Sequence, residues 1–114
     1  MLASRLEEAA GAIGLLLRTV DAVTSLEAGL REHSPDLVLL DLADAAFPFR
    51  PTLMLLQTHV PRPVVLAFFP HVRKELGEMA RTAGCELVLP RSRLLLDLPA
   101  SLREGLAMRS ANRS

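Results

Sequence analysis

The chain has 114 residues, half of them hydrophobic, and its 13 basic and 13 acidic side chains give a formal net charge of zero. This length fits one domain that buries about two-thirds of its unfolded surface. The balanced charge provides no field that attracts nucleic acid, and without Trp or Tyr the chain has no base-stacking platform. Its apolar runs are shorter than the roughly 20 residues of a membrane helix. We therefore expect neither a nucleic-acid partner nor a membrane partner.

Cysteine use and the N-terminal sequence both bear on the compartment. Cys85 is the single cysteine, so no internal disulfide can form, and this fits a reducing environment. The N-terminus has no basic segment followed by a long apolar stretch, which argues against a signal peptide. We expect a cytoplasmic protein.

The first third of the chain predicts a helix, a strand and a second helix. Residues 4–7 (SRLE) form a capping-box pattern that opens a helix, which Gly14 can end. Residues 15–20 (LLLRTV) predict a strand. Residues 24–27 (TSLE) repeat the capping-box pattern and open a helix that ends at His33.

A second strand follows Pro35, which ends the preceding helix. The continuous apolar run over residues 37–40 is typical of a strand buried on both faces of a parallel sheet, and we expect this strand to be central. Asp41 closes the run, at the position where a central strand delivers a side chain to the crevice at the carboxyl edge.

The remaining residues continue the same alternation of helices and strands. After a loop over 45–51, the pattern predicts a helix over 52–59, a strand over 64–69, a helix over 72–83 closed by Gly84, a strand over 86–89 and a helix that Asp97 caps. We expect residues 1–108 to form a single domain and residues 109–114 to be a flexible polar tail. Strands that alternate with helices predict an α/β fold, a three-layer α/β/α doubly wound parallel sheet.

Three stretches of this sequence resemble the receiver domain of bacterial response regulators. Residues 35–42 (PDLVLLDL) resemble the third strand of that family, residues 63–69 (PVVLAFF) the fourth strand, and residues 81–90 (RTAGCELVLP) the end of the fourth helix and the fifth strand. The resemblance implies a flavodoxin-like fold with four of the usual five strands, the first being missing. It places Asp41 at the phosphoacceptor position, and it implies a protein partner such as a histidine kinase or another signalling protein.

The chain departs from the receiver pattern where the family does its chemistry. No acidic pair precedes the first helix, although such a pair helps to hold magnesium in the family. The hydroxyl position falls on Phe68, or on Ala67 if the alignment shifts by one, and the lysine position falls on Arg91. Magnesium binds through one or two carboxylates, so Asp41 alone is a poor site, and Asp44 in the next loop is the nearest further carboxylate. We expect no metal and no cofactor, with Mg²⁺ required only if Asp41 accepts phosphate.

The missing first strand leaves three arrangements open. The strand at residues 15–20 closes on the strand at 37–42, a partner supplies a strand, or Met1 is a mis-assigned or truncated start. Exposed sheet edges would favour self-association into a homodimer.

His71 and Cys85 are further candidate site residues. His71 follows the strand at 64–69, so it belongs to the same sheet edge as Asp41 and Arg91, whereas Cys85 lies at the opposite edge and is expected to be a buried residue. Residues 94–96 (LLL) cannot all point inward, so they predict core together with an exposed apolar ledge.

Three functions are compatible with these residues. We favour a degenerate receiver-like domain of two-component signalling, not an enzyme, which acts as a regulatory protein–protein interaction module without phosphotransfer; Asp41 would then be a strand-end carboxylate paired with Arg91. The first alternative is a phosphoaccepting receiver, with Asp41 as acceptor and Arg91 contacting the phosphoryl group. The second is a small hydrolase or ligand-binding protein that uses Asp41, His71 and Arg91.

Overall fold

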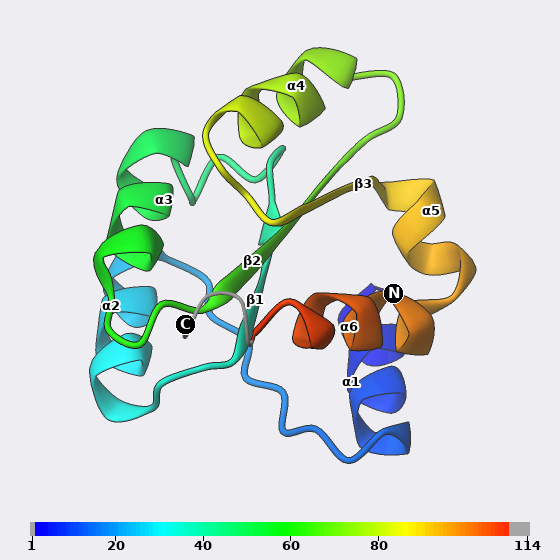
Figure 1. Ribbon diagram of the computed structural model, residues 1–114, viewed down its shortest axis with the longest axis horizontal. Coiled ribbons are helices and arrows are strands. Elements are labelled where there is room, and N and C mark those ends of the chain that lie inside the picture. Colours follow the sequence, from blue (N-terminus) through cyan, green and yellow to red (C-terminus); the bar gives the residue numbers. More distant parts are fainter. Residues whose placement is uncertain (1, 110–114) are drawn as a thin grey trace.

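The structure is a computed structural model that describes residues 2–109. Over these residues six helices and three strands follow one another along the chain (Figure 1). In order they are α1 (Leu2–Ala12), α2 (Val23–Glu32), β1 (Leu37–Asp41), α3 (Phe49–Thr58), β2 (Val64–Phe69), α4 (Lys74–Thr82), β3 (Leu87–Pro90), α5 (Arg91–Leu96) and α6 (Leu98–Ala107). None of these helices is long and apolar enough to cross a membrane.

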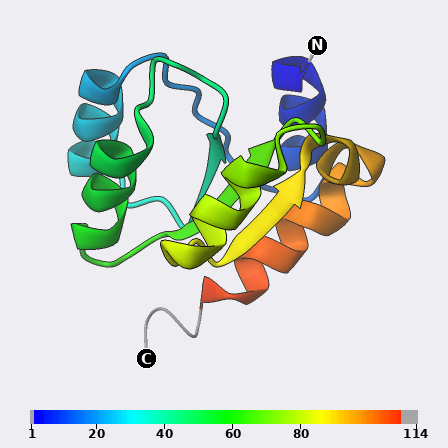
Figure 2. The ribbon, with the colours of Figure 1, turned by 90° about the horizontal axis from the view of Figure 1, so that it is seen from above.

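The three strands form one parallel sheet in the order β1-β2-β3, with β2 in the centre. Leu39 of β1 lies opposite Leu66 of β2, and Phe68 of β2 lies opposite both Asp41 of β1 and Leu89 of β3. Every residue of β2 is buried, whereas most of β1 is only partly buried. Helices lie on both sides of the sheet (Figure 2), which gives the α/β layering that the apolar strands predict.

Each face of the sheet carries its own apolar cluster, because alternate residues of a strand point to opposite faces. The first core cluster joins the sheet to α1, α5 and α6, and its buried members are Ala9, Ala10, Leu66, Phe68, Leu87, Leu89, Leu94, Leu98 and Leu102. The second core cluster joins the other face to α2, α3 and α4, and its buried members are Leu26, Leu30, Leu40, Leu53, Leu56, Val65, Ala67, Ala80 and Cys85. The strand β2 contributes to both clusters and therefore connects the two halves of the core.

The strand predicted over residues 15–20 does not form. The segment has no regular secondary structure; Leu15 and Leu17 pack against the first core cluster, while Leu16 is fully exposed. Among the described residues the sheet thus has three strands, and the expectation of four is wrong. For the same reason β1, which was expected to be central, is an edge strand. The composition of residues 15–20 favours a strand, but a strand forms only when its main chain pairs with a neighbouring strand.

The helix starts agree with the sequence pattern at Asp97 and differ from it at Ser4 and Thr24. The capping-box patterns at Ser4 and at Thr24 are wrong, since α1 already includes Ser4 and the N-cap of α2 is Ala22, without a side-chain cap. The prediction for Asp97 is confirmed, because its side chain accepts a hydrogen bond from Ala100 N at the start of α6. The helix α5 was not predicted, because its six residues are too few for apolar periodicity to identify.

Charged side chains tie the amino ends of the strands together. Glu86 Oε1 accepts a hydrogen bond of 2.8 Å from Val65 N, and Glu86 Oε2 lies 3.3 Å from the guanidinium of Arg62. At the start of β1, Arg109 Nη1 lies 3.1 Å from Asp36 Oδ1. The rest of the expected polar tail, residues 110–114, lies outside the described residues.

Two helices approach the sheet closely at a glycine. A Cβ added to Gly77 of α4 would lie 2.6 Å from Cε1 of Phe69, and one added to Gly105 of α6 would lie 2.8 Å from Cδ1 of Leu37. Since Phe69 is itself buried in β2, its ring has little room to move away. Gly77 therefore sets how closely α4 approaches the sheet, whereas the flexible end of the partly buried Leu37 side chain can shift away from Gly105.

We expect Gly77→Ala to destabilise the protein by about 1–3 kcal/mol, because the added methyl group overpacks against Phe69. The matched control is Gly29→Ala in α2, where an added Cβ meets nothing within 4 Å. There the higher helix propensity of alanine should stabilise the protein by up to about 1 kcal/mol. Urea unfolding of both variants measures these free energies. If both alanine variants raised the free energy of unfolding equally, the Phe69 ring would have moved aside without destabilising the protein.

We expect Thr52→Val to raise the free energy of unfolding by about 1 kcal/mol. Thr52 of α3 is fully buried, and its hydroxyl has no hydrogen-bond partner among the described residues, so valine removes an unsatisfied polar group of similar shape. Thr58→Val is the control, because the Thr58 hydroxyl donates to Met54 O at 2.8 Å and its loss brings no such gain. Thermal and urea unfolding of both variants test the difference. A destabilised Thr52→Val protein would contradict this account.

Candidate functional site

The carboxyl edge of the sheet carries three of the residues that the sequence singled out. Asp41 ends β1, Phe68 lies next to the end of β2, and Arg91 directly follows β3. The loops after β1 and β2 add Asp44 and His71 at the same edge. Parallel strands with helical crossovers bring these positions to one side of the molecule, so the fold places them at the expected edge.

The Asp41 carboxylate accepts a hydrogen bond from the backbone of the loop that follows it. Asp41 Oδ1 accepts a hydrogen bond of 3.0 Å from Ala43 N, two residues further along the chain. This bond closes a turn as β1 ends. In the strand register Asp41 lies opposite Phe68, which is 4% exposed and belongs to the first core cluster. Directly opposite residues share a face of the sheet, so the aromatic side chain of Phe68 lies beside Asp41.

Asp44 forms the same kind of turn one step later. Its Oδ1 accepts a hydrogen bond of 2.9 Å from Ala46 N, and its carbonyl oxygen accepts one of 3.1 Å from Phe47 N. The two carboxylates therefore each shape a separate part of the loop between β1 and α3.

The ion pair expected between Asp41 and Arg91 is absent from the described residues, and that expectation is wrong. The reason is local, since the Asp41 carboxylate bonds to the backbone of the following loop while Arg91 is exposed as the first residue of α5. His71 is also exposed, in the turn after β2. The structure thus brings the three residues to one edge without joining them.

The residues at this edge do not fit a magnesium ion. No group of three His, Cys, Asp or Glu side chains able to hold a metal occurs within residues 2–109. The two nearest carboxylates already accept hydrogen bonds from the backbone. Magnesium needs oxygen ligands in octahedral geometry, and Phe68 offers none.

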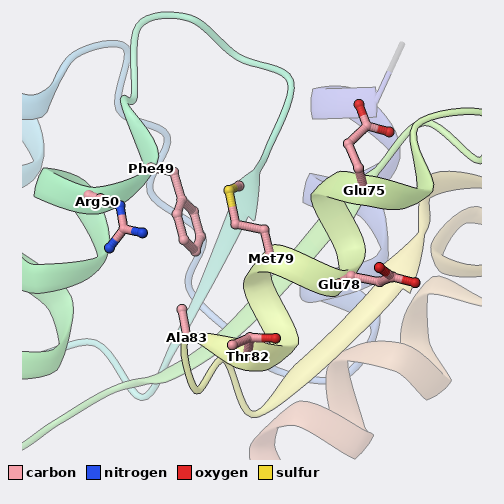
Figure 3. Close-up of a pocket in the computed structure, with 7 residues that line it drawn as sticks. All are labelled: Phe49, Arg50, Glu75, Glu78, Met79, Thr82 and Ala83. Atoms are coloured by element: carbon pink, nitrogen blue, oxygen red, sulfur yellow. The ribbon is translucent and has the colours of Figure 1, made fainter.

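A groove of about 500 Å³ lies elsewhere, between α3 and α4 (Figure 3). Phe49 and Met79 face each other across it, with Arg50 on the α3 side. Glu75 and Glu78 stand on the α4 side, and in Figure 3 their carboxylates point away from Arg50. Thr82 and Ala83 complete the lining. None of the residues predicted for a site lines this groove.

Sequence reasoning missed this groove because its lining residues carry no recognisable signal. The sequence places Met79 on the apolar face of a helix and Phe49 in a loop, each of which is typical of core packing. Their contact across the groove depends on how α3 and α4 pack on the second face of the sheet.

Glu75, which lines the groove, already has a cationic partner. Arg73 Nε lies 2.6 Å from Glu75 Oε2 and holds the pKa of that carboxyl below its ordinary value.

Cys85 is a core residue, as the sequence indicated. It is 8% exposed and belongs to the second core cluster. Burial raises the pKa of the Cys85 thiol from 9.0 to about 11, and the Glu86 carboxylate adds to that rise. Since the thiolate is the nucleophile, the raised pKa leaves little of the reactive form of Cys85 at neutral pH.

No protein-family model matches the chain, and no curated protein sequence matches it significantly.

We expect iodoacetamide to alkylate Cys85 far more slowly in the folded protein than in urea at pH 8. A pKa of about 11 in place of 9.0 leaves about a hundredfold less thiolate at this pH, and burial blocks access further. Mass spectrometry of samples quenched over time measures both rates. Comparable rates in the two states would show that Cys85 is accessible and ionisable in the folded protein.

Proposed function

We propose that this chain is a degenerate receiver-like domain, which acts as a regulatory protein–protein interaction module and transfers no phosphoryl group. The observation that carries the proposal is the register pairing of Asp41 with the buried ring of Phe68. An acidic residue ends the strand where a receiver would carry its phosphoacceptor. The groups that would assist phosphoryl transfer there are replaced.

The chemistry of phosphoryl transfer supports this reading. The transferred group needs its charge neutralised by a metal and by positioned donors. Beside Asp41 the opposite position is aromatic, and the Asp41 carboxylate accepts a bond from Ala43 N. Arg91 forms no ion pair with Asp41 in the described part of the chain. In this proposal the role of the Asp41 carboxylate is to stabilise the turn that follows β1.

The exposed side chain of Leu96 on α5 is a candidate docking contact. Leu94 is fully buried and Leu95 packs against the first core cluster, whereas Leu96 is 81% exposed. Leu96 follows Arg91 and Arg93 in the chain, so a partner that contacts it would place acidic groups beside an apolar contact. A cytoplasmic signalling protein, such as a histidine kinase, is the partner class that the receiver resemblance implies.

The alternative of a phosphoaccepting receiver keeps one supporting observation, which is the position of Asp41 at the carboxyl end of a parallel strand. The alternative of a small hydrolase has less support. It requires Asp41, His71 and Arg91 to converge on a substrate, whereas both His71 and Arg91 are exposed and the Phe68 ring lies beside Asp41.

Treatment with Mg²⁺ and acetyl phosphate, followed by intact-mass measurement, tests the proposal. We expect no phosphate adduct on the unchanged protein, because the metal ligands and the hydroxyl donor of a receiver are missing. The variants Asp41→Asn and Asp44→Asn serve as matched controls. An adduct that disappears in Asp41→Asn but persists in Asp44→Asn would replace this proposal with the phosphoaccepting alternative.

A further inference from the structure

The outer edge of β1 carries main-chain groups that no described strand takes up. Val64 N donates to Asp36 O at 3.1 Å, and Leu42 N donates to Phe68 O at 3.0 Å. Because alternate residues of a parallel strand bond to a given neighbour, the even-numbered residues of β1 face β2. The main-chain groups of the odd-numbered residues therefore face away from β2, and within residues 2–109 no strand pairs with them.

The sequence of β1 lacks the usual protection of an edge strand. Natural edges carry Lys, Pro, a bulge or an inward-pointing charge, or a loop or helix covers them, whereas residues 37–41 read LVLLD. The opposite edge of the sheet differs, since β3 has only four residues and ends in Pro90. An open apolar edge recruits strands from other chains, so β1 needs a cover from elsewhere in the protein.

Residues 15–20 pass from one face of the sheet to the other beside β1. Leu15 and Leu17 pack against the first core cluster, and Val20 packs against the second, on the opposite face. Three residues of extended chain span at most about 11 Å, so the chain between Leu17 and Val20 crosses the edge directly. Figure 2 shows this segment on the side of β1 that faces away from β2.

Side chains hold this segment against the sheet while its outer surface is open to water. Leu15 and Leu17 are partly buried, whereas Leu16 is fully exposed and Arg18 is exposed as well. This alternation is that of an extended chain with one side against the protein. The segment has no regular secondary structure and forms no ladder with β1. Its contact with the sheet therefore rests on side-chain packing.

We propose that residues 15–20 are an autoinhibitory strap, which covers the outer edge of β1 and keeps it from accepting a further strand. Paired strands lie about 4.8 Å apart, so an added strand would need the space beside β1 past which the strap runs. While Leu17 and Val20 stay packed against the two core clusters, the strap blocks an incoming strand from the main chain of β1. Release of the strap opens this edge.

The strap can open while the rest of the protein stays folded. A few partly buried side chains and no ladder retain it, and these are features of a segment with low local stability. The flanking helices are held separately, since α1 buries Ala9 and Ala10 and α2 buries Leu26 and Leu30. Both ends of the strap therefore stay attached while it lifts off and closes again, so the cover is reversible.

The inference does not rest on the proposed function, because it uses packing and main-chain groups and not the chemistry of Asp41. A phosphate adduct would overturn the proposal of the previous subsection and leave the strap as it is. A strap without effect on the edge would overturn the inference and leave that proposal untouched. The two experiments therefore fail separately.

Sedimentation velocity of strap variants over a range of protein concentrations tests the inference on the full chain. Leu17→Ser and Val20→Ser each weaken one contact of the strap, one on each face of the sheet. Leu16→Ser is the matched control, because the same change falls on a fully exposed side chain. Self-association is the readout, since the strand available to an opened edge in the purified sample is that of a second copy.

We expect Leu17→Ser and Val20→Ser to associate at concentrations at which the unchanged protein and Leu16→Ser are monomers. Serine loses apolar burial that holds the strap closed, so the open form becomes more populated. The dissociation constant should fall by about tenfold or more. Circular dichroism checks that each variant is folded. If Leu17→Ser does not fold, Leu17→Ala replaces it, because alanine keeps an apolar side chain.

Amide hydrogen exchange by NMR identifies the surface through which an anchor variant associates. The amides of Leu37, Leu39 and Asp41 face the outer edge, so their protection should rise with protein concentration. Val38 and Leu40 already bond to β2, so the protection of their amides should change little. General unfolding would instead lower the protection of Val38 and Leu40.

Four outcomes would overturn the inference. Folded anchor variants that stay as monomeric as Leu16→Ser would show that release leaves the edge inert. Equal association of Leu16→Ser would show that the strap contacts are not the cause. Association without protection of the Leu39 amide would use a different surface. An unchanged protein that already associates with a protected Leu39 amide would have an edge that the strap leaves open.

Discussion

Burial of β2 on both faces is the constraint on which the rest of the structure depends. All six residues from Val64 to Phe69 are nearly inaccessible to water, and full burial of one large apolar side chain contributes about 1.5–3 kcal/mol. A strand of this kind requires helices on both sides of the sheet, and the two core clusters supply them. Gly77 and Gly105 then allow α4 and α6 to approach the sheet closely. The layering of the protein follows from this one strand.

The same constraint explains why the carboxyl edge holds the expected residues without forming an active centre. Parallel strands deliver their ends to one edge, so Asp41, Phe68 and Arg91 are neighbours in the topology. Whether neighbours react depends on the direction of each side chain and on its local partners. Alternation along β2 directs Phe68 into the first core cluster, and the loop after β1 takes up the carboxylate of Asp41.

The main-chain N–H and C=O groups have hydrogen-bond partners in some parts of the sheet and lack them in others among the described residues. The amino end of β2 is well satisfied, since Glu86 accepts from Val65 N and also pairs with Arg62. The outer edge of β1 has no such partner within the described residues. Residues 15–20 have the composition of a strand but form none.

The sequence by itself determined the α/β class, the strands β1 and β2 to within a residue, the core role of Cys85 and the cap at Asp97, because these depend on local composition and spacing. Tertiary structure alone decided that residues 15–20 stay unpaired and that β1 lies at an edge, since strand pairing is a contact between distant segments. It also decided the Asp41 turn, the exposure of Arg91 and the groove between α3 and α4, because side-chain direction follows from packing. Sequence spacing fixes which residues reach an edge of the sheet, and only the packed chain fixes what each of them contacts there.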